Sequence, residues 1–274
     1  VVFPEFRWAQ PFVAEARSKL CENLLNDFAP GGVHIERSTH YHNITLETAL
    51  SFVELARLNK IDAPPELCER LYSALLFAAY AQLPDGEIPL INDSDTLDHS
   101  GMFEAGFRLF RDPALQWVSS RGAQGAPLPT PSRDFDGYLI LSDSWGQDPA
   151  SFARRQHVFF DRAPLGAGSH SHYDLLSLCW FANGHPILVD PGRFTYDPEP
   201  DSAGIDWRGA FKSTAFHNTV EIDGKDQTRY RSKSKTPPPG VARYDKSRHT
   251  ANHGPDVEIR GAAHHIGDCG DWAM

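Results

Sequence analysis

The 274-residue sequence lacks several features that would assign it to a class of protein at once. No apolar run approaches the roughly 20 residues that span a bilayer, so no membrane-spanning segment is predicted. Basic residues are not in excess: 26 Lys and Arg stand against 36 Asp and Glu, which gives a net charge of −10. A net acidic chain is not expected to bind nucleic acid.

Cysteine is also scarce, with four in the chain and none in a C-x-x-C or zinc-knuckle spacing. Cys21 and Cys68 fall in helical patterns and Cys179 in a strand pattern, so buried thiols are predicted and no redox compartment is indicated. No signal peptide is visible either. Because the chain begins at Val1 without Met, we expect a fragment, and the missing signal does not locate the protein.

Hydrophobic periodicity divides the chain into a helical part and a β part. Apolar residues recur at helical spacing in four segments, at residues 8–28, 44–59, 64–79 and 100–110. Short apolar or alternating runs between turn signals predict strands at residues 138–141, 157–160, 175–181, 187–189, 218–222 and 257–260. The Gly- and Pro-rich stretch between them predicts a helical domain at 1–121, a linker at 122–134 and a β domain at 135–274.

The segment 168–174, G-S-H-S-H-Y-D, carries the strongest chemical signal. In a strand, His170, His172 and Asp174 would share one face. A two-residue turn at 183–184 would return the chain so that Asp190 lies beside His172. A further strand is expected to begin at His217.

Two imidazoles and a carboxylate suit a zinc-like ion with an open coordination position. We therefore predict a divalent metal centre, with zinc as the expected ion and His172, Asp190 and His217 as ligands. The alternative is that these are the polar residues of an ordinary hairpin.

Residues 34–42 place six chargeable or phenolic groups in nine positions between two helices. Such density is unusual for a connecting loop and indicates a functional role. The alternative is a helix-capping loop with Ser38 or Asn43 as the cap. The acidic stretch at residues 92–95 lacks the Gly and Glu of a calcium loop, so a turn with capping carboxylates is favoured there.

Basic residues gather after residue 192, although the whole chain is acidic. They either form a solvated loop or a local site for an anionic substrate. The members are Arg193, Arg208, Lys212, Lys225, Arg229, Arg231, Lys233 and Lys235.

Three phrases in this order resemble those of the heparinase II/III-like polysaccharide lyases: G-S-H-S-H-Y-D-L-L-S, A-N-G-H-P-I-L-V-D-P-G and R-G-A-F-K-S-T-A-F-H-N-T-V-E-I-D-G-K-D-Q. A fourth, G-G-x-x-x-E-x-S-x-x-Y-H, is matched by residues 31–42. The resemblance implies an α+β multidomain protein, in which a partial (α/α) toroid of helical hairpins precedes an antiparallel β-sandwich that is incomplete here. It also implies a periplasmic or secreted location.

The resemblance further implies the roles of individual residues. Tyr41 would serve as Brønsted base, acid or both, and His170 would neutralise the substrate carboxylate; Tyr173 and Tyr196 are alternative phenols. The metal ligands would again be the three residues predicted above, with a structural role for the ion. Contacts to substrate, or support for those contacts, are expected from Glu36, His42, Tyr196 and Arg208. The family's Asn in an N-N-H-like phrase has no counterpart in this sequence.

The function expected from these residues is β-elimination on an anionic, uronic-acid-containing polysaccharide, such as heparan sulfate or alginate. Two alternatives stay open. One is a metal-dependent carbohydrate hydrolase that activates a water at the metal centre. The other is a polysaccharide-binding protein without turnover. The sequence indicates no oligomeric state.

Overall fold

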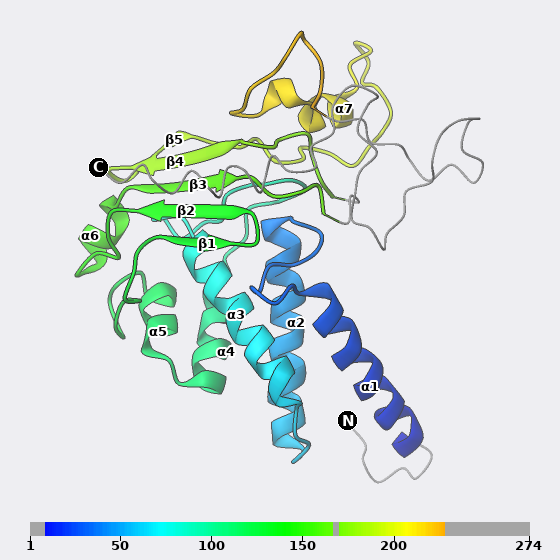
Figure 1. Cartoon of the computed structure of the whole chain (residues 1–274), viewed down its shortest axis with the longest axis vertical. Helices are drawn as coiled ribbons and strands as arrows, with labels where there is room; N and C mark the ends of the chain where they lie inside the picture. Colours follow the sequence, from blue (N-terminus) through cyan, green and yellow to red (C-terminus); the bar gives the residue numbers. More distant parts are fainter. Residues whose placement is uncertain (1–8, 167–169, 228–274) are drawn as a thin grey trace.

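The computed structural model describes residues 9–166 and 170–227, as helices followed by one antiparallel sheet (Figure 1). Five helices come first, and α1 to α4 extend from one side of the sheet. Their bounds are α1 Ala9–Asp27, α2 Thr39–Leu58, α3 Pro65–Ala81, α4 Ser100–Phe110 and α5 Pro113–Ser119.

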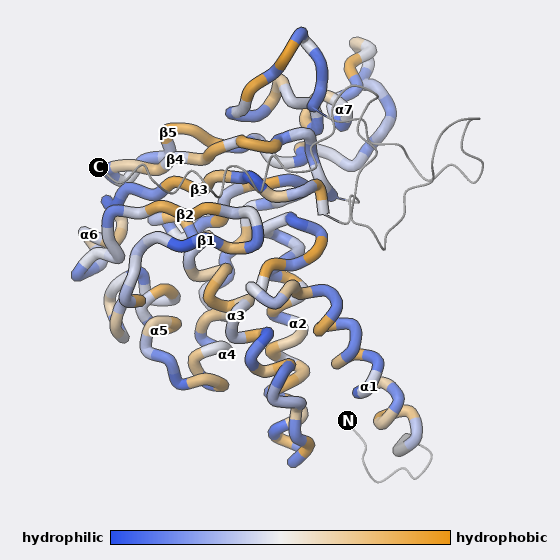
Figure 2. The backbone as a smooth tube through the Cα atoms, in the orientation of Figure 1, coloured by the Kyte–Doolittle hydropathy of each residue, from blue (hydrophilic) through white to orange (hydrophobic). Residues whose placement is uncertain are grey.

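The sheet has five strands in the order β1-β2-β3-β4-β5, each antiparallel to its neighbour. Strands β2 to β4 are mainly hydrophobic stretches, whereas β1 begins with hydrophilic residues (Figure 2). Their bounds are β1 Arg133–Phe135, β2 Tyr138–Ser142, β3 His157–Asp161, β4 Leu178–Ala182 and β5 His185–Leu188. Three short helical elements complete the described part: α6 Pro149–Arg154, α7 Trp207–Lys212 and the 3-10 turn η1 Thr214–Phe216.

Helix α2 begins five residues before the predicted start, because Ser38 caps it. The Ser38 hydroxyl accepts a hydrogen bond from the Tyr41 backbone N–H at 3.2 Å, and thereby satisfies a donor that the first helical turn leaves free. The same hydroxyl donates to the Asp93 carbonyl at 2.9 Å. The cap therefore places Tyr41 in the first turn of α2, beside the loop that carries Asp93.

The predicted hairpin between β4 and β5 is confirmed. Asn183 and Gly184 form its two-residue turn, with φ of 53° and 85°. Positive φ at both positions is what a type I′ turn requires, and Asn-Gly supplies it at little cost. Strand β4 begins three residues later than predicted, since Leu176 takes φ of 68° within a turn.

Two strand predictions are wrong. Residues 170–174 form no strand, because their backbone bonds to the loop after α3: the Asp93 N–H donates to the His170 carbonyl at 2.9 Å. Residues 218–222 likewise form no strand, and only Ile222 makes a single bridge, to Lys225. The strand predicted at 257–260 lies outside the described residues, and the predicted domain boundaries stay predictions.

Helices and sheet share one hydrophobic core in the part of the chain described. Phe77 of α3 lies with its ring centroid 5.4 Å from that of Phe135 and 5.6 Å from that of Tyr138. Tyr80, one turn further along α3, lies 5.1 Å from Trp145. Aromatic burial of this kind contributes a large share of core stability. The last two turns of α3 therefore anchor the helices to the sheet.

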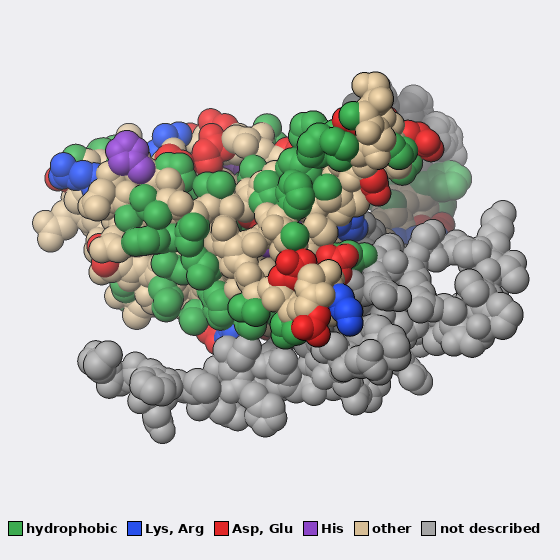
Figure 3. Space-filling model, turned by 90° about the horizontal axis from the view of Figure 1, so that it is seen from above, with side chains coloured by type: hydrophobic (Ala, Val, Ile, Leu, Met, Phe, Trp, Pro, Cys, Tyr) green, Lys and Arg blue, Asp and Glu red, His purple; other side chains and the backbone are tan. Residues whose placement is uncertain are grey.

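The outer edge of the sheet is exposed along β5, where no residue of the strand is buried. Hydrophobic side chains gather on the face of the molecule seen from above (Figure 3). Ile187, Val189, Phe194 and Val220 are among the exposed large hydrophobic residues. Among the described residues, no helix is long and apolar enough to cross a membrane. Cys21 and Cys179 are buried free thiols, as predicted, and Cys68 is partly buried.

Candidate active site

The predicted proton-transfer residues meet between helix α2 and the loop before β4. The rings of Tyr41 and His170 stack with centroids 3.9 Å apart and planes 23° apart. The Tyr196 hydroxyl lies 2.9 Å from the Tyr41 hydroxyl and 3.4 Å from His170 Nδ1. The Glu36 carboxylate lies 3.8 Å from His170 Nε2. Four of the predicted residues are therefore brought to one place.

The two phenols at this site differ in their surroundings. Burial, together with the hydrogen bond to Tyr41, raises the pKa of Tyr196 well above its usual range. Tyr196 consequently remains a neutral phenol at physiological pH. It can donate its hydrogen bond to the Tyr41 oxygen.

Arg208 and Arg193 bracket the Tyr196 ring from α7 and from the loop after β5. Their guanidinium carbons lie 5.1 Å and 4.0 Å from the ring centroid. Arg208 also donates two hydrogen bonds to the Asp93 carboxylate, at 2.5 and 2.7 Å, and Arg193 donates to Asp95 at 2.6 Å. Both cations are thus paired with carboxylates. The prediction that Arg208 contacts substrate is untested, and the structure commits two of its donors to the protein.

His42 does not face the same space as Tyr41. Its ring packs against Phe28 and Phe77, and it is 1% exposed. One ring nitrogen donates to the Ala74 carbonyl at 3.1 Å, and the other accepts from the His34 N–H at 3.3 Å. The role of His42 stays a prediction; at 1% exposure, support of substrate contacts fits its position better than direct contact. Through its hydrogen bond from the His34 N–H, His42 supports the loop that carries Glu36.

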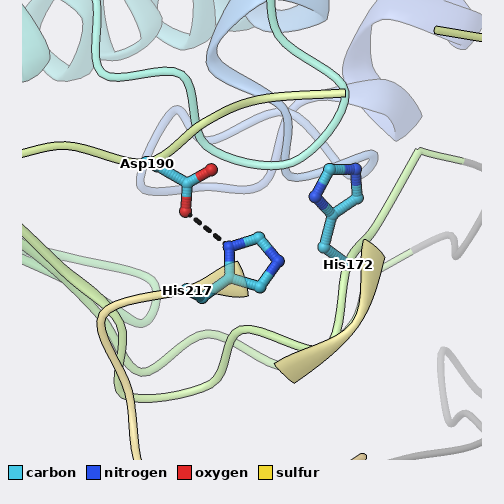
Figure 4. A group of neighbouring side chains, drawn as sticks. All are labelled: His172, Asp190 and His217. Carbon is cyan, nitrogen blue, oxygen red and sulfur yellow. Dashed lines mark hydrogen bonds and ion pairs between the residues drawn. The ribbon is translucent and has the colours of Figure 1, made fainter. Parts of the chain in front are cut away.

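The three predicted metal ligands converge from separate segments (Figure 4). One possible ligand atom from each of His172, Asp190 and His217 lies within 4.8 Å of the other two, and all three residues are buried. Asp190 accepts a hydrogen bond from His217 Nδ1 at 2.8 Å.

The free ring nitrogens of this group fit a metal ion. His172 Nδ1 and His217 Nε2 are both buried without a hydrogen-bond partner, and Figure 4 shows the two rings turned toward each other. A buried nitrogen lone pair without a donor is costly unless something fills the role. Burial also lowers the pKa of His172, which favours the neutral imidazole that binds metals. The group can hold a metal ion.

Asp93 is the residue of this site that the sequence did not identify. Its carboxylate is completely buried and lies 3.0 Å from His170 Nδ1 and 2.9 Å from His172 Nε2. Burial works against its ionisation, but hydrogen bonds from His170, His172 and Arg208 hold the pKa of Asp93 far below its usual range. Residues 92–95 form a loop with a bend at 92–93, and its second residue does not cap the turn but joins the two predicted sites. A short acidic turn gave no local signal for that role.

The buried His42 predicts a pH dependence of stability. Burial lowers the pKa of His42 from 6.5 to about 3. Between these two pH values, the unfolded state therefore binds a proton more readily than the folded state does. The contribution of neutral, buried His42 to the free energy of unfolding is fully present above pH ~6.5 and is lost as the pH falls. We expect His42→Gln, which can keep both hydrogen bonds, to reduce the slope of unfolding free energy against pH by about 1.4 kcal/mol per unit between about pH 6 and 4.

Chemical denaturation at a series of pH values measures this slope. His185→Gln on the exposed strand β5 is the control and should leave the slope unchanged. An unchanged slope in His42→Gln would show that His42 is protonated in the folded protein. His157, whose pKa burial also lowers to about 3, supplies a dependence that persists in both variants.

Comparison with known proteins identifies the chain's relatives. Residues 1–114 match the sequence model of the heparinase II/III N-terminus family. Residues 129–265 match the sequence model of the heparinase II/III-like C-terminal family. A heparin-sulfate lyase of Bacteroides thetaiotaomicron is 26% identical over 242 residues, which are 81% of this chain and 34% of that protein.

Solved structures agree on the fold. A heparinase III superimposes with a TM-score of 0.73 at 22% identity and covers 82% of this chain and 35% of its own. A heparan sulfate lyase of Pedobacter heparinus gives a TM-score of 0.72 at 21% identity, with the same coverage. The chain thus spans about a third of the length of these relatives. Since the C-terminal model alone matches half of the sequence, the chain belongs to the heparinase II/III-like family.

Proposed function

We propose that the protein is a polysaccharide lyase that cleaves a uronic-acid-containing chain by β-elimination. The substrate class is a heparan sulfate-like glycosaminoglycan or an alginate-like polyuronate. The observation that carries the proposal is the stacked contact of Tyr41 with His170, whose ring centroids lie 3.9 Å apart. A phenol and an imidazole side by side can supply the base and the carboxylate donor of an elimination. The similarity to a heparin-sulfate lyase supports the reaction class.

Elimination from a 4-linked uronate needs a base at C5, a donor at the carboxylate and an acid at the leaving oxygen. Tyr41, as the phenolate, takes the C5 proton; the C–H electron pair forms the C4–C5 double bond, and the C4–O4 bond breaks toward oxygen. The Tyr41 phenol then returns a proton to the O4 leaving group. His170 donates a hydrogen bond to the carboxylate, where negative charge develops in the transition state.

Tyr196 supports the phenolate form of Tyr41 in this scheme. Its hydroxyl, 2.9 Å from that of Tyr41, donates a hydrogen bond to the oxygen that carries the charge. Glu36 lies on the other side of His170, with its carboxylate 3.8 Å from Nε2. At 27% exposure, Glu36 is also accessible to substrate hydroxyl groups.

The metal centre is proposed to hold zinc in a structural role. A bound ion would cross-link the loop before β4, the end of β5 and the segment after η1 through His172, Asp190 and His217. The imidazoles of His172 and His217 are fully buried, which leaves substrate no access to the ion. This burial favours a lyase with a structural metal over a hydrolase that activates a water there.

For the complete protein we propose a toroid of helical hairpins joined to a β-sandwich, with the substrate bound between them. The described helices and five-stranded sheet would then be part of each. A polymeric substrate also favours a periplasmic or secreted location.

The reaction is tested by incubating the protein with heparan sulfate, heparin, alginate, hyaluronan and chondroitin. Elimination creates a conjugated double bond that absorbs in the ultraviolet, whereas hydrolysis creates none. Since the chain spans a third of its relatives, the full-length protein is assayed beside the 274-residue chain. An ultraviolet-absorbing product supports the proposal and names the substrate. Reducing ends without that absorbance would point to a hydrolase, and binding without cleavage by the full-length protein to a binding protein.

A further inference from the structure

The carboxylate of Asp93 contacts both the candidate proton-transfer site and the metal group, through His170 and His172. Asp93 lies in the loop between α3 and α4, and its side chain is 0% exposed. Its Oδ2 atom is bonded to His170 Nδ1, and its Oδ1 atom to His172 Nε2. Arg208 donates to both oxygens from the opposite direction.

These bonds determine where the ring hydrogens of the two histidines are. Arg208 donates to both oxygens of Asp93, so this carboxylate acts as a hydrogen-bond acceptor toward its other partners as well. His170 must therefore carry its hydrogen on Nδ1, and His172 must carry its hydrogen on Nε2. The two histidines are held as opposite tautomers by one side chain.

Each tautomer exposes the nitrogen that its site needs. In His172 the free atom is Nδ1, which is buried without a partner on the side of Asp190 and His217. In His170 the free atom is Nε2, which lies 3.8 Å from the Glu36 carboxylate, and the side chain is partly exposed. Nε2 is thus the ring nitrogen of His170 that Asp93 leaves free to contact a ligand.

We propose that Asp93 is a positioning residue that orients both imidazoles, and so couples the metal group to the elimination site. The part that concerns His170 rests on the proposed function. The part that concerns His172 rests on the metal group alone. A carboxylate that accepts a hydrogen bond from the second ring nitrogen of a metal-binding histidine commonly raises metal affinity by 10–100-fold.

The test is Asp93→Asn in the full-length protein. The asparagine has the same size, but one oxygen becomes an NH2 group, which cannot accept from a histidine and repels the donors of Arg208. One histidine must turn or change tautomer. We expect zinc affinity, measured by competition with a chelating dye, to fall about 10–100-fold. We also expect kcat on the cleaved polysaccharide to fall by about 10-fold or more, while KM changes little.

The matched control is Asp98→Asn, which alters an exposed carboxylate bonded to the Ser100 N–H outside both sites. It should keep wild-type zinc affinity and kcat. Wild-type zinc affinity and kcat in Asp93→Asn would overturn the proposal and leave Asp93 as an ordinary ion-pair partner of Arg208. A protein that cleaves no polysaccharide would contradict the proposed function, whereas the zinc measurement would still test the role of Asp93 toward His172.

If the Asp93→Asn variant fails to fold, a second measurement tests the proposal on the wild-type protein. Nitrogen-15 NMR of the wild-type histidines at alkaline pH reports which ring nitrogen carries the hydrogen. The proposal requires the Nδ1–H form for His170 and the Nε2–H form for His172. The same tautomer in both residues would overturn it.

Discussion

Tyr41→Phe in the full-length protein is expected to lower kcat for elimination by about 10²- to 10⁴-fold, the usual contribution of a positioned proton-transfer group. The substitution removes one oxygen and keeps the ring, so the stacking on His170 at 3.9 Å is retained. KM should change little, because the lost interaction is with the transferred proton. Initial rates of ultraviolet absorbance at several substrate concentrations give both constants.

Two further tyrosine variants sharpen this result. Tyr72→Phe removes a hydroxyl that bonds to Asp112 among the helices, away from the site, and should keep the wild-type kcat. Tyr196→Phe should cause a smaller loss than Tyr41→Phe, since the hydroxyl of Tyr196 only assists. A larger loss in Tyr196→Phe than in Tyr41→Phe would assign the base to Tyr196 instead.

Removal of the proposed metal ion is expected to lower the melting temperature by roughly 10 °C. A ligand present at a thousand times its Kd stabilises the folded state by about 4 kcal/mol, and 1 kcal/mol shifts the melting temperature by ~2–4 °C in a chain of this size. The physical origin here is the pair of buried nitrogens, His172 Nδ1 and His217 Nε2, which have no other partner. Differential scanning calorimetry before and after chelation, with metal analysis of the eluate, measures the effect.

The controls separate the metal centre from other effects of chelation. His172→Ala should melt at the same temperature with and without the chelator, whereas His185→Ala on the exposed strand β5 should behave as wild type. If the wild type also shows no difference, the three residues are the polar side chains of an ordinary hairpin. Elimination should persist after chelation below the melting transition; its immediate loss would assign the ion to the chemistry.

Local sequence patterns predicted the parts of the fold that local interactions decide. The Asn183–Gly184 turn follows from the backbone preferences of two residues, and α4 was predicted with its observed bounds. Helix α2 was predicted too short, because its start depends on the Ser38 cap and not on apolar periodicity. The alternating pattern around His170 predicted a strand that the structure does not have. Period-2 spacing shows which residues could share a face, but not whether the backbone has a neighbouring strand to pair with.

The candidate site was predictable where the family's phrases carry it, and not elsewhere. Tyr41, His170 and the three candidate metal ligands stand in recognisable phrases, and the structure brings Tyr41 to His170 and the three ligands to one another. Asp93 stands in a short acidic turn, and its partners His170 and Arg208 lie 77 and 115 residues further along the chain. Burial of His42 depends on Phe28 and Phe77, which no motif connects to it. Long-range packing of this kind leaves no local trace.

The aromatic contacts of α3 with the sheet have a consequence for motion. Tyr41 comes from the helical part and His170 from the segment before β4, so a hinge between helices and sheet would separate them. Such a hinge would pull Phe77 from Phe135 and Tyr138, and Tyr80 from Trp145, exposing rings that are costly to hydrate. The contact between the Tyr41 and His170 rings therefore depends on the packing of α3 against the sheet.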